Sequence, residues 1–258
     1  MNVQEWFGLK GKTAVVIGGG GVLGSTMAEG LADAGADVAI VDLDKGKAEA
    51  AAGRVEKSGV RGLAVAADAS SKAELERADS EVADAFGGAD ILINAPGVNS
   101  ATPFFDIAES EWDRILNVNL KSMMLACQIF GRRMIDRKKG GSIINISSAS
   151  SGPPLSKVFT YGISKAGVNS LTQFLAREWA RQGVRVNALL PGFFPAEQNR
   201  KLLTPERTAS ILNHTPMGRF GNAEELTGAV VWLASEKASS FVTGALIRVD
   251  GGFSAMTI

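Results

Sequence analysis

The chain has 258 residues, which suits one large α/β domain or two small ones, and its 45% hydrophobic residues are enough for a sizeable core. Its 27 basic and 27 acidic side chains balance, which argues against a nucleic-acid partner, because phosphate binding needs a clustered basic excess. One cysteine, Cys127, and one histidine, His214, exclude an internal disulfide framework and are too few for a His/Cys metal site. The sequence shows no transmembrane run and no signal-peptide pattern, so we expect a cytoplasmic protein.

Short runs rich in apolar and β-branched residues alternate along the chain with helical patterns. Their apolarity is continuous, which is typical of strands covered on both faces in a parallel sheet. Seven runs are predicted to be strands: 13–17, 38–41, 62–66, 91–93, 142–146, 184–189 and 245–249. Helices are predicted around 23–31 and at 45–58, 71–86, 109–138, 160–182 and 223–235. The alternation predicts a single domain over 1–258, an α/β Rossmann-type fold with a doubly wound, seven-stranded parallel sheet.

A glycine-rich loop follows the first predicted strand and precedes the first long helix pattern. Residues 18–21 are all glycine, and Val22, Leu23 and Gly24 lead into the helix. Glycines let the backbone approach a pyrophosphate, whose charge is stabilised at the helix N-terminus. Asp42 ends the second predicted strand, where a carboxylate can accept hydrogen bonds from an adenosine ribose. A glycine run alone is also compatible with a simple turn, but this context favours dinucleotide binding.

A second group of polar residues is typical of proton-transfer chemistry. Tyr161 and Lys165 are four positions apart in a helical pattern and so share one helix face, where an ammonium favours the phenolate and lowers the tyrosine pKa. Ser148 closes the fifth predicted strand, Asn119 interrupts an apolar helix, and 94–97 follow the fourth strand. A helix cap at Ser148 and a plain turn at 94–97 are the alternatives. Their joint occurrence at one edge of the sheet favours a catalytic site with Tyr161 as the acid/base.

These motifs, taken in order, resemble the short-chain dehydrogenase/reductase family over essentially the whole chain. Ser148 precedes Tyr161 by 13 positions, the spacing usual in that family. The matching segments are 18–24, 94–97, Asn119, Ser148, 161–165, 191–192 and 249–252.

The resemblance implies four catalytic residues. Tyr161 is expected to be the general acid/base, and Lys165 to lower its pKa and bind the nicotinamide ribose. Ser148 is expected to hydrogen-bond the reacting oxygen, and Asn119 to hold a water in a proton relay.

The resemblance also implies an NAD-type cofactor and the residues that contact it. Asp68 is expected at the adenine, and 191–194 at the carboxamide. The implied cofactor-binding residues are Gly18, Gly21, Val22, Leu23, Gly24, Asp42, Leu43, Asp68, Ala69, Asn94, Ala95, Pro96, Gly97, Tyr161, Lys165, Pro191, Gly192 and Phe194. The chain departs from the family's usual residues at Ile17, Val22, Ala95 and Ala196, which affects the details of cofactor geometry.

The adenosine end of the predicted site favours NAD over NADP. Asp42 repels a 2′-phosphate, and neither the glycine loop nor Leu43 offers a cation. Lys45 is the nearest positive charge in the sequence, and the neighbouring Asp44 offsets it. We expect a preference for NAD of at least about a hundredfold in kcat/KM.

The substrate is predicted from the segment 191–221, the one long irregular stretch, which we expect to cover the ligand. Together with 154–157 it resembles the D-mannonate oxidoreductase branch of the family, although an insertion common in that branch after 94–97 is missing. The resemblance implies a secondary alcohol and ketone of a sugar acid or polyol. Candidate substrate-binding residues are Ser148, Lys157, Gln198, Asn199 and Arg200.

Two other functions stay open at this point. One is a 3-oxoacyl-thioester reductase, although such enzymes typically prefer NADPH, and the other is a non-catalytic NAD-binding sensor. The family resemblance further implies a homotetramer, joined partly through the helices that contain Asn119 and Tyr161.

Overall fold

The computed structural model describes residues 3–195 and 203–256. Its strands form one parallel sheet of seven, in the order β3-β2-β1-β4-β5-β6-β7. The strands are β1 (Thr13–Ile17), β2 (Asp37–Asp42), β3 (Gly62–Ala66), β4 (Ile91–Asn94), β5 (Gly141–Ile146), β6 (Val184–Pro191) and β7 (Leu246–Val249). The predicted α/β fold with a seven-stranded parallel sheet is confirmed.

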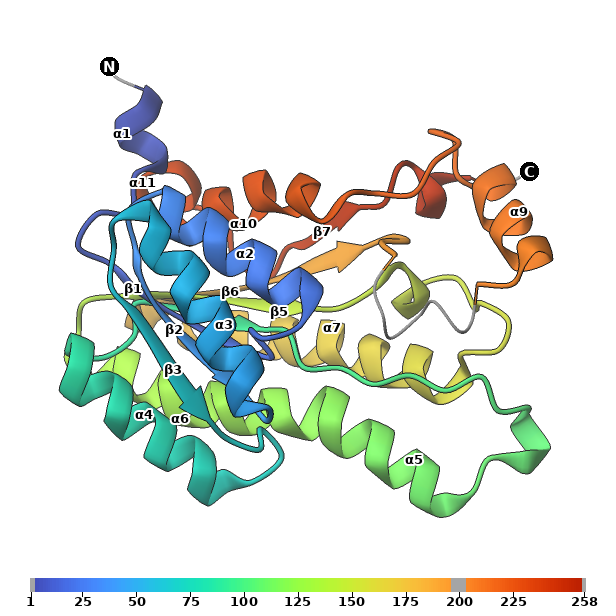
Figure 1. Cartoon of the computed structure of the whole chain (residues 1–258), viewed down its shortest axis with the longest axis horizontal. Coiled ribbons are helices and arrows are strands. Elements are labelled where there is room, and N and C mark those ends of the chain that lie inside the picture. The colour runs from blue at the N-terminus through green and yellow to red at the C-terminus, as the bar shows by residue number, and fades with distance from the viewer. Residues whose placement is uncertain (1–2, 196–202, 257–258) are drawn as a thin grey trace.

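Helices cover both faces of this sheet (Figure 1). The helices on one face are α2 (Val22–Asp33), α3 (Lys45–Val55) and α10 (Thr227–Ala234). Those on the other are α4 (Lys72–Phe86), α6 (Ser122–Arg137) and α7 (Phe159–Trp179). Shorter helices are α1 (Val3–Phe7), α5 (Glu109–Leu116), α9 (Pro205–His214) and α11 (Glu236–Ser239). No helix in residues 3–195 or 203–256 is both long and apolar enough to cross a membrane.

The strand β1 shows why the apolar runs are continuous. All five of its residues are buried. Ala14 and Val16 belong to the core under α2, α3 and α10, whereas Val15 and Ile17 belong to the core under α4, α6 and α7. Successive side chains of a strand point to opposite faces, so a strand between two helical layers is apolar on both faces except where a buried polar side chain is hydrogen-bonded.

The strand order reverses next to β1, and this fixes where a ligand can bind. β1 pairs with β2 on one side and with β4 on the other. The chain therefore crosses over opposite faces on leaving these strands, and a crevice opens at their carboxyl ends. The glycine loop and the residues after β4 both lie at this edge.

Two segments differ from the sequence prediction. The helix predicted at 109–138 is interrupted by a π-helical turn, Asn117–Lys121, between α5 and α6. The stretch 191–221 was predicted to be irregular, which is wrong for α9. The side chain of Thr204 caps α9 by accepting a hydrogen bond from the Arg207 amide (3.2 Å), and Pro205 occupies the first turn. Both are ordinary helix-start signals that the prediction overlooked.

Candidate active site

A cavity of about 590 Å³ lies at the carboxyl edge of the sheet, within the usual size of a small-ligand site. Seventeen of the eighteen predicted cofactor-binding residues line it: Gly18, Gly21, Val22, Leu23, Gly24, Asp42, Leu43, Asp68, Ala69, Ala95, Pro96, Gly97, Tyr161, Lys165, Pro191, Gly192 and Phe194. Ser148 also lines it. The structure thus brings the glycine loop and three of the four predicted catalytic residues to one cavity, whereas Asn119 is not part of its lining.

Asn94 is the predicted cofactor-binding residue that does not line the cavity. It is fully buried, and its amide nitrogen donates to the Asn145 side-chain oxygen (2.8 Å) and to the Cys127 sulfur (3.4 Å). Asn145 in turn donates to Thr172 (3.0 Å). Asn94 therefore ties β4 to β5 beneath the cavity. Burial raises the pKa of Cys127 to about 12, so this thiol is not a nucleophile.

The Asp42 carboxylate is held rigidly at one end of the cavity. One oxygen accepts a hydrogen bond from the Gly20 amide (2.9 Å), and the other accepts one from the Asp44 amide (3.0 Å). These bonds link the end of β2 to the glycine loop. The negative charge therefore has a fixed place beside the loop.

Two cations at the same end were missed by the sequence analysis. Lys47 and Arg54, both on α3, line the cavity. Lys45, the nearest cation in the sequence, does not line it and pairs with Glu49 (3.7 Å). The premise that the adenosine end lacks a cation is therefore wrong. A position in the first turn of the helix after β2 is the signal that could have found Lys47, whereas Arg54 lies in the last turn of α3.

Tyr161 and Ser148 form the polar centre of the cavity. Tyr161 is half-buried, and the Ser148 side chain lies close enough to its hydroxyl to act on its pKa. Ser148 accepts hydrogen bonds from the amide and the hydroxyl of Ser150 (3.2 and 2.9 Å). Burial raises the Tyr161 pKa, and the nearby Ser148 side chain offsets part of that rise. The predicted lowering of this pKa by Lys165 is not what the protein alone shows.

Lys165 reaches the same centre from one turn further along α7. Its side chain is buried, and its ammonium nitrogen donates to the Ile146 carbonyl (2.8 Å) and lies 5.7 Å from the centre of the Tyr161 ring. Desolvation lowers the Lys165 pKa to about 7, because the charged form loses its water.

Asn119 lies in the π-helical turn and is fully buried. Its side chain accepts from the Val98 amide (2.8 Å) and donates to the Val98 carbonyl (2.9 Å) and the Ser164 hydroxyl (3.0 Å). Ser164 donates to the Tyr161 carbonyl (2.6 Å). Asn119 thus connects a wall of the cavity to the turn of α7 that carries Tyr161. Such π turns are frequent at functional sites, but only the polar residue in an apolar helix hinted at this one.

Comparison with known proteins agrees with this geometry. A family model described as "Enoyl-(Acyl carrier protein) reductase" matches residues 21–254. The 2-dehydro-3-deoxy-D-gluconate 5-dehydrogenase of Escherichia coli (strain K12) is 38% identical, over 96% of this chain and 98% of its own length. The chain belongs to the short-chain dehydrogenase/reductase family.

Two solved structures of this family are similar over nearly the whole chain. A gluconate 5-dehydrogenase from Burkholderia cenocepacia J2315, in complex with NADP and tartrate, is 34% identical with a TM-score of 0.94 and covers 99% of this chain and 100% of its own. A candidate D-mannonate oxidoreductase from Haemophilus influenzae, with bound NAD, is 34% identical with a TM-score of 0.92 and covers 99% of both chains. As a short-chain dehydrogenase/reductase, the chain acts on a CH–OH group with NAD or NADP as cofactor.

Beyond Ser148, the predicted substrate-binding residues lie either outside the cavity lining or outside the described part of the chain. Lys157 is exposed, has a left-handed backbone (φ 64°), and does not line the cavity. Residues 198–200, which include the predicted Arg200, lie outside the described part of the chain. The helix α9 contacts the loop before Tyr161, since the Arg207 guanidinium donates to the Ser156 carbonyl (3.2 Å).

Within residues 3–195 and 203–256, no group of three or more His, Cys, Asp or Glu residues is arranged to hold a metal ion.

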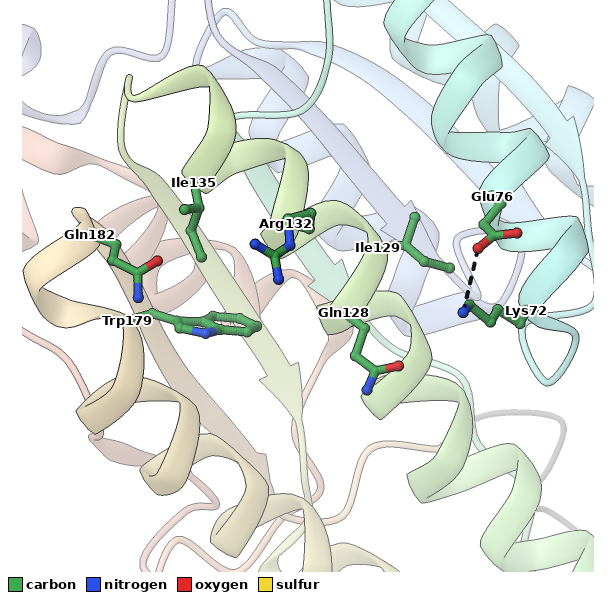
Figure 2. A pocket seen from close by; sticks show the side chains of 8 residues that line it. All are labelled: Lys72, Glu76, Gln128, Ile129, Arg132, Ile135, Trp179 and Gln182. Carbon is green, nitrogen blue, oxygen red and sulfur yellow. Dashed lines mark ion pairs between the residues drawn. The ribbon is translucent and has the colours of Figure 1, made fainter.

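A second hollow lies on the helical surface formed by α4, α6 and α7 (Figure 2). Arg132 and Trp179 line one side of it, and the Lys72–Glu76 ion pair (3.7 Å) lies on the other side, beyond Ile129. None of the predicted site residues is part of it. It is therefore separate from the cavity that the glycine loop of this dehydrogenase lines.

The buried Lys165 makes the stability of the cofactor-free protein depend on pH. The unfolded chain keeps the proton up to its ordinary pKa of 10.5, whereas the folded chain loses it near pH 7. The unfolding free energy therefore rises with pH between these values, by at most about 1.4 kcal/mol per pH unit, and the gain is lost below pH 7. We expect Lys165→Met to be more stable than wild type at pH 6, with an advantage that shrinks by pH 9.

Thermal unfolding of both proteins at pH 6, 7.5 and 9 measures this difference. Lys237→Met, a change of an exposed lysine on α11, is the control and is expected to follow the wild-type profile. Parallel profiles for wild type and Lys165→Met would mean that the Lys165 ammonium is not desolvated.

Proposed function

We propose that this chain oxidises a secondary alcohol of a sugar acid to the ketone, or catalyses the reverse reduction, with NAD as the preferred cofactor. The observation that carries the proposal is that Tyr161, Ser148 and Lys165 line the same cavity as the glycine loop. This arrangement couples a proton-transfer group to a dinucleotide site.

The glycine loop fits a dinucleotide. The N-cap of α2, Gly21, makes no side-chain capping bond, so the amides of the first turn are available to a pyrophosphate. A Cβ at Gly24 would lie 2.3 Å from the Gly18 carbonyl oxygen, so only glycine allows this tight turn. Asp42 would accept hydrogen bonds from the adenosine ribose.

We propose that Tyr161 exchanges the proton of the substrate oxygen. A bound nicotinamide would supply the hydride acceptor for oxidation and the hydride donor for reduction. The Ser148 hydroxyl already accepts two hydrogen bonds from Ser150, so it can act toward the substrate as a hydrogen-bond donor. Directed at the substrate oxygen, this donor would stabilise the charge that develops there.

Lys165 and Asn119 act behind this pair in the proposal. When protonated, the Lys165 ammonium beside the ring of Tyr161 would favour the phenolate and oppose the effect of burial. Asn119 would hold Val98 and, through Ser164, the Tyr161 backbone in place. Its predicted role in a water relay stays a prediction.

A sugar acid is the substrate class that the sequence and the cavity favour together. The lining includes the side chains of Asn99 and Ser148, which suit a hydroxylated chain. Similarity to the gluconate and mannonate enzymes supports a carboxylate at one end of it. Arg200 is the residue we propose for that carboxylate, since a guanidinium binds it bidentately.

A substrate panel tests this choice. In the oxidation arms, purified protein and NAD are mixed separately with hexonates, uronates and polyols. In the reduction arm, the protein is mixed with NADH and a 3-oxoacyl thioester. Absorbance is followed at about 340 nm in every arm. We expect the highest kcat/KM for a sugar acid. A higher value for the thioester would replace the proposal with the acyl reductase alternative, and turnover of neither class above a protein-free blank would favour the sensor.

The outward face of α7 supports the proposed homotetramer. Phe159, Ile163 and Phe174 are 47%, 41% and 69% exposed, and the small residues Ala166 and Ser170 lie between them on the same face. An exposed apolar stripe of this kind is typical of a subunit contact. Light scattering is expected to give four chains per particle, and a monomer would contradict the contact.

The buried single cysteine also agrees with the proposed cytoplasmic location, where thiols stay reduced.

A further inference from the structure

The adenosine end of the cavity carries two opposite charges, Asp42 and Lys47. We propose that Lys47 is a second cofactor-specificity residue, which binds a 2′-phosphate and so allows the site to accept NADP as well as NAD. The inference rests on the proposed dinucleotide site and does not depend on which alcohol is oxidised.

The glycine loop places the two side chains together. A Cβ added to Gly20 would lie 2.7 Å from the Lys47 Cβ and 2.9 Å from one carboxylate oxygen of Asp42. Both side chains therefore approach the same point of the loop, one from α3 and one from the end of β2. A ribose whose 2′-hydroxyl meets Asp42 would bring a 2′-phosphate within reach of Lys47.

Lys47 is the uncommitted cation at this end. Arg54 is paired with Glu29 (2.6 Å), and Lys45 with Glu49 (3.7 Å). In the described part of the chain, the Lys47 side chain is exposed and makes neither an ion pair nor a hydrogen bond. Its ammonium can therefore move to an incoming phosphate without breaking an existing contact.

The two charges act in opposite directions on the phosphorylated cofactor. Asp42 is fixed by the amides of Gly20 and Asp44 and cannot turn away from a phosphate of about two negative charges. An ammonium at hydrogen-bond distance offsets part of that repulsion. Lys47 therefore reduces the preference for NAD that Asp42 imposes.

Binding measured by calorimetry on the cofactor-free protein tests the role of Lys47 without any substrate. We expect Lys47→Gln to weaken NADP binding about ten- to a hundredfold more than NAD binding, the range of a charge-assisted hydrogen bond. Lys45→Gln is the matched control, an exposed lysine two positions away that is paired with Glu49. It is expected to leave the ratio of the two affinities unchanged. The NADP affinity of wild type should also fall more steeply with salt than that of Lys47→Gln.

An Asp42→Ser background keeps the test decisive if wild type binds NADP too weakly to measure. There, Asp42→Ser with Lys47→Gln should bind NADP about ten- to a hundredfold less tightly than Asp42→Ser alone. Equal loss of NAD and NADP affinity, or no loss of NADP affinity in either background, would overturn the proposal. Absence of binding to both dinucleotides would overturn it together with the dinucleotide site, whereas binding without sugar-acid turnover would overturn only the proposed substrate.

Discussion

Tyr161→Phe is expected to lower kcat by about a hundred- to ten-thousandfold, the usual contribution of general acid/base catalysis. The substitution removes the hydroxyl that lies near Ser148 and keeps the ring that packs near Lys165. Cavity shape and cofactor contacts should survive, because no other atom is lost. Steady-state kinetics with the best substrate of the panel measure the loss.

Dinucleotide affinity is the control for this variant. Calorimetry should give the same Kd for NAD in Tyr161→Phe and in wild type. Activity within a factor of about three of wild type would remove Tyr161 from the mechanism, since acid/base catalysis is worth far more.

Asp42→Ser is expected to reduce the preference for NAD over NADP by about a hundredfold in kcat/KM, which corresponds to roughly 2.7 kcal/mol. The change removes the carboxylate that would accept a hydrogen bond from a ribose hydroxyl, and this weakens NAD binding. It also removes the repulsion of a 2′-phosphate, which admits NADP, and it leaves the Lys47 ammonium unopposed.

Asp44→Asn is the matched control for that prediction. Asp44 is two residues further on, does not line the cavity, and caps α3 by accepting from the Lys47 amide (3.1 Å). Asparagine keeps the cap and loses the charge. If Asp42→Ser alters the cofactor ratio no more than Asp44→Asn does, then Asp42 does not face the ribose.

The sheet could be predicted from the sequence because the residue pattern of a buried strand is local to that strand. A strand buried on both faces is rich in apolar residues. β1 and β6 are buried along their whole lengths, and their polar exceptions are Thr13, Arg185 and Asn187. The place of the cavity also followed, since parallel strands bring the glycine loop and Ser148 to one edge. The catalytic residues came from spacing, as with Tyr161 and Lys165 on successive turns of α7.

Other features depend on contacts between distant segments. Asn94 is directed away from the cavity by its bonds to Asn145 and Cys127, which no local pattern reveals. Lys47 reaches the adenosine end because α3 packs beside the glycine loop, so counting along the chain from Asp42 selected Lys45 instead. The direction in which the Tyr161 pKa shifts depends on how deeply the side chain is buried, and the spacing to Lys165 does not determine that depth.

In the proposed reaction, a hydride passes between a sugar-acid carbon and a nicotinamide while Tyr161 moves the proton. The most direct test uses the preferred sugar acid of the panel, deuterated at the carbinol carbon, with wild type and unlabelled NAD. Mass spectrometry of the reduced cofactor should show one deuterium per turnover, and Tyr161→Phe should form the same labelled product far more slowly. Reduced cofactor without deuterium, or equal rates in the two proteins, would contradict the account.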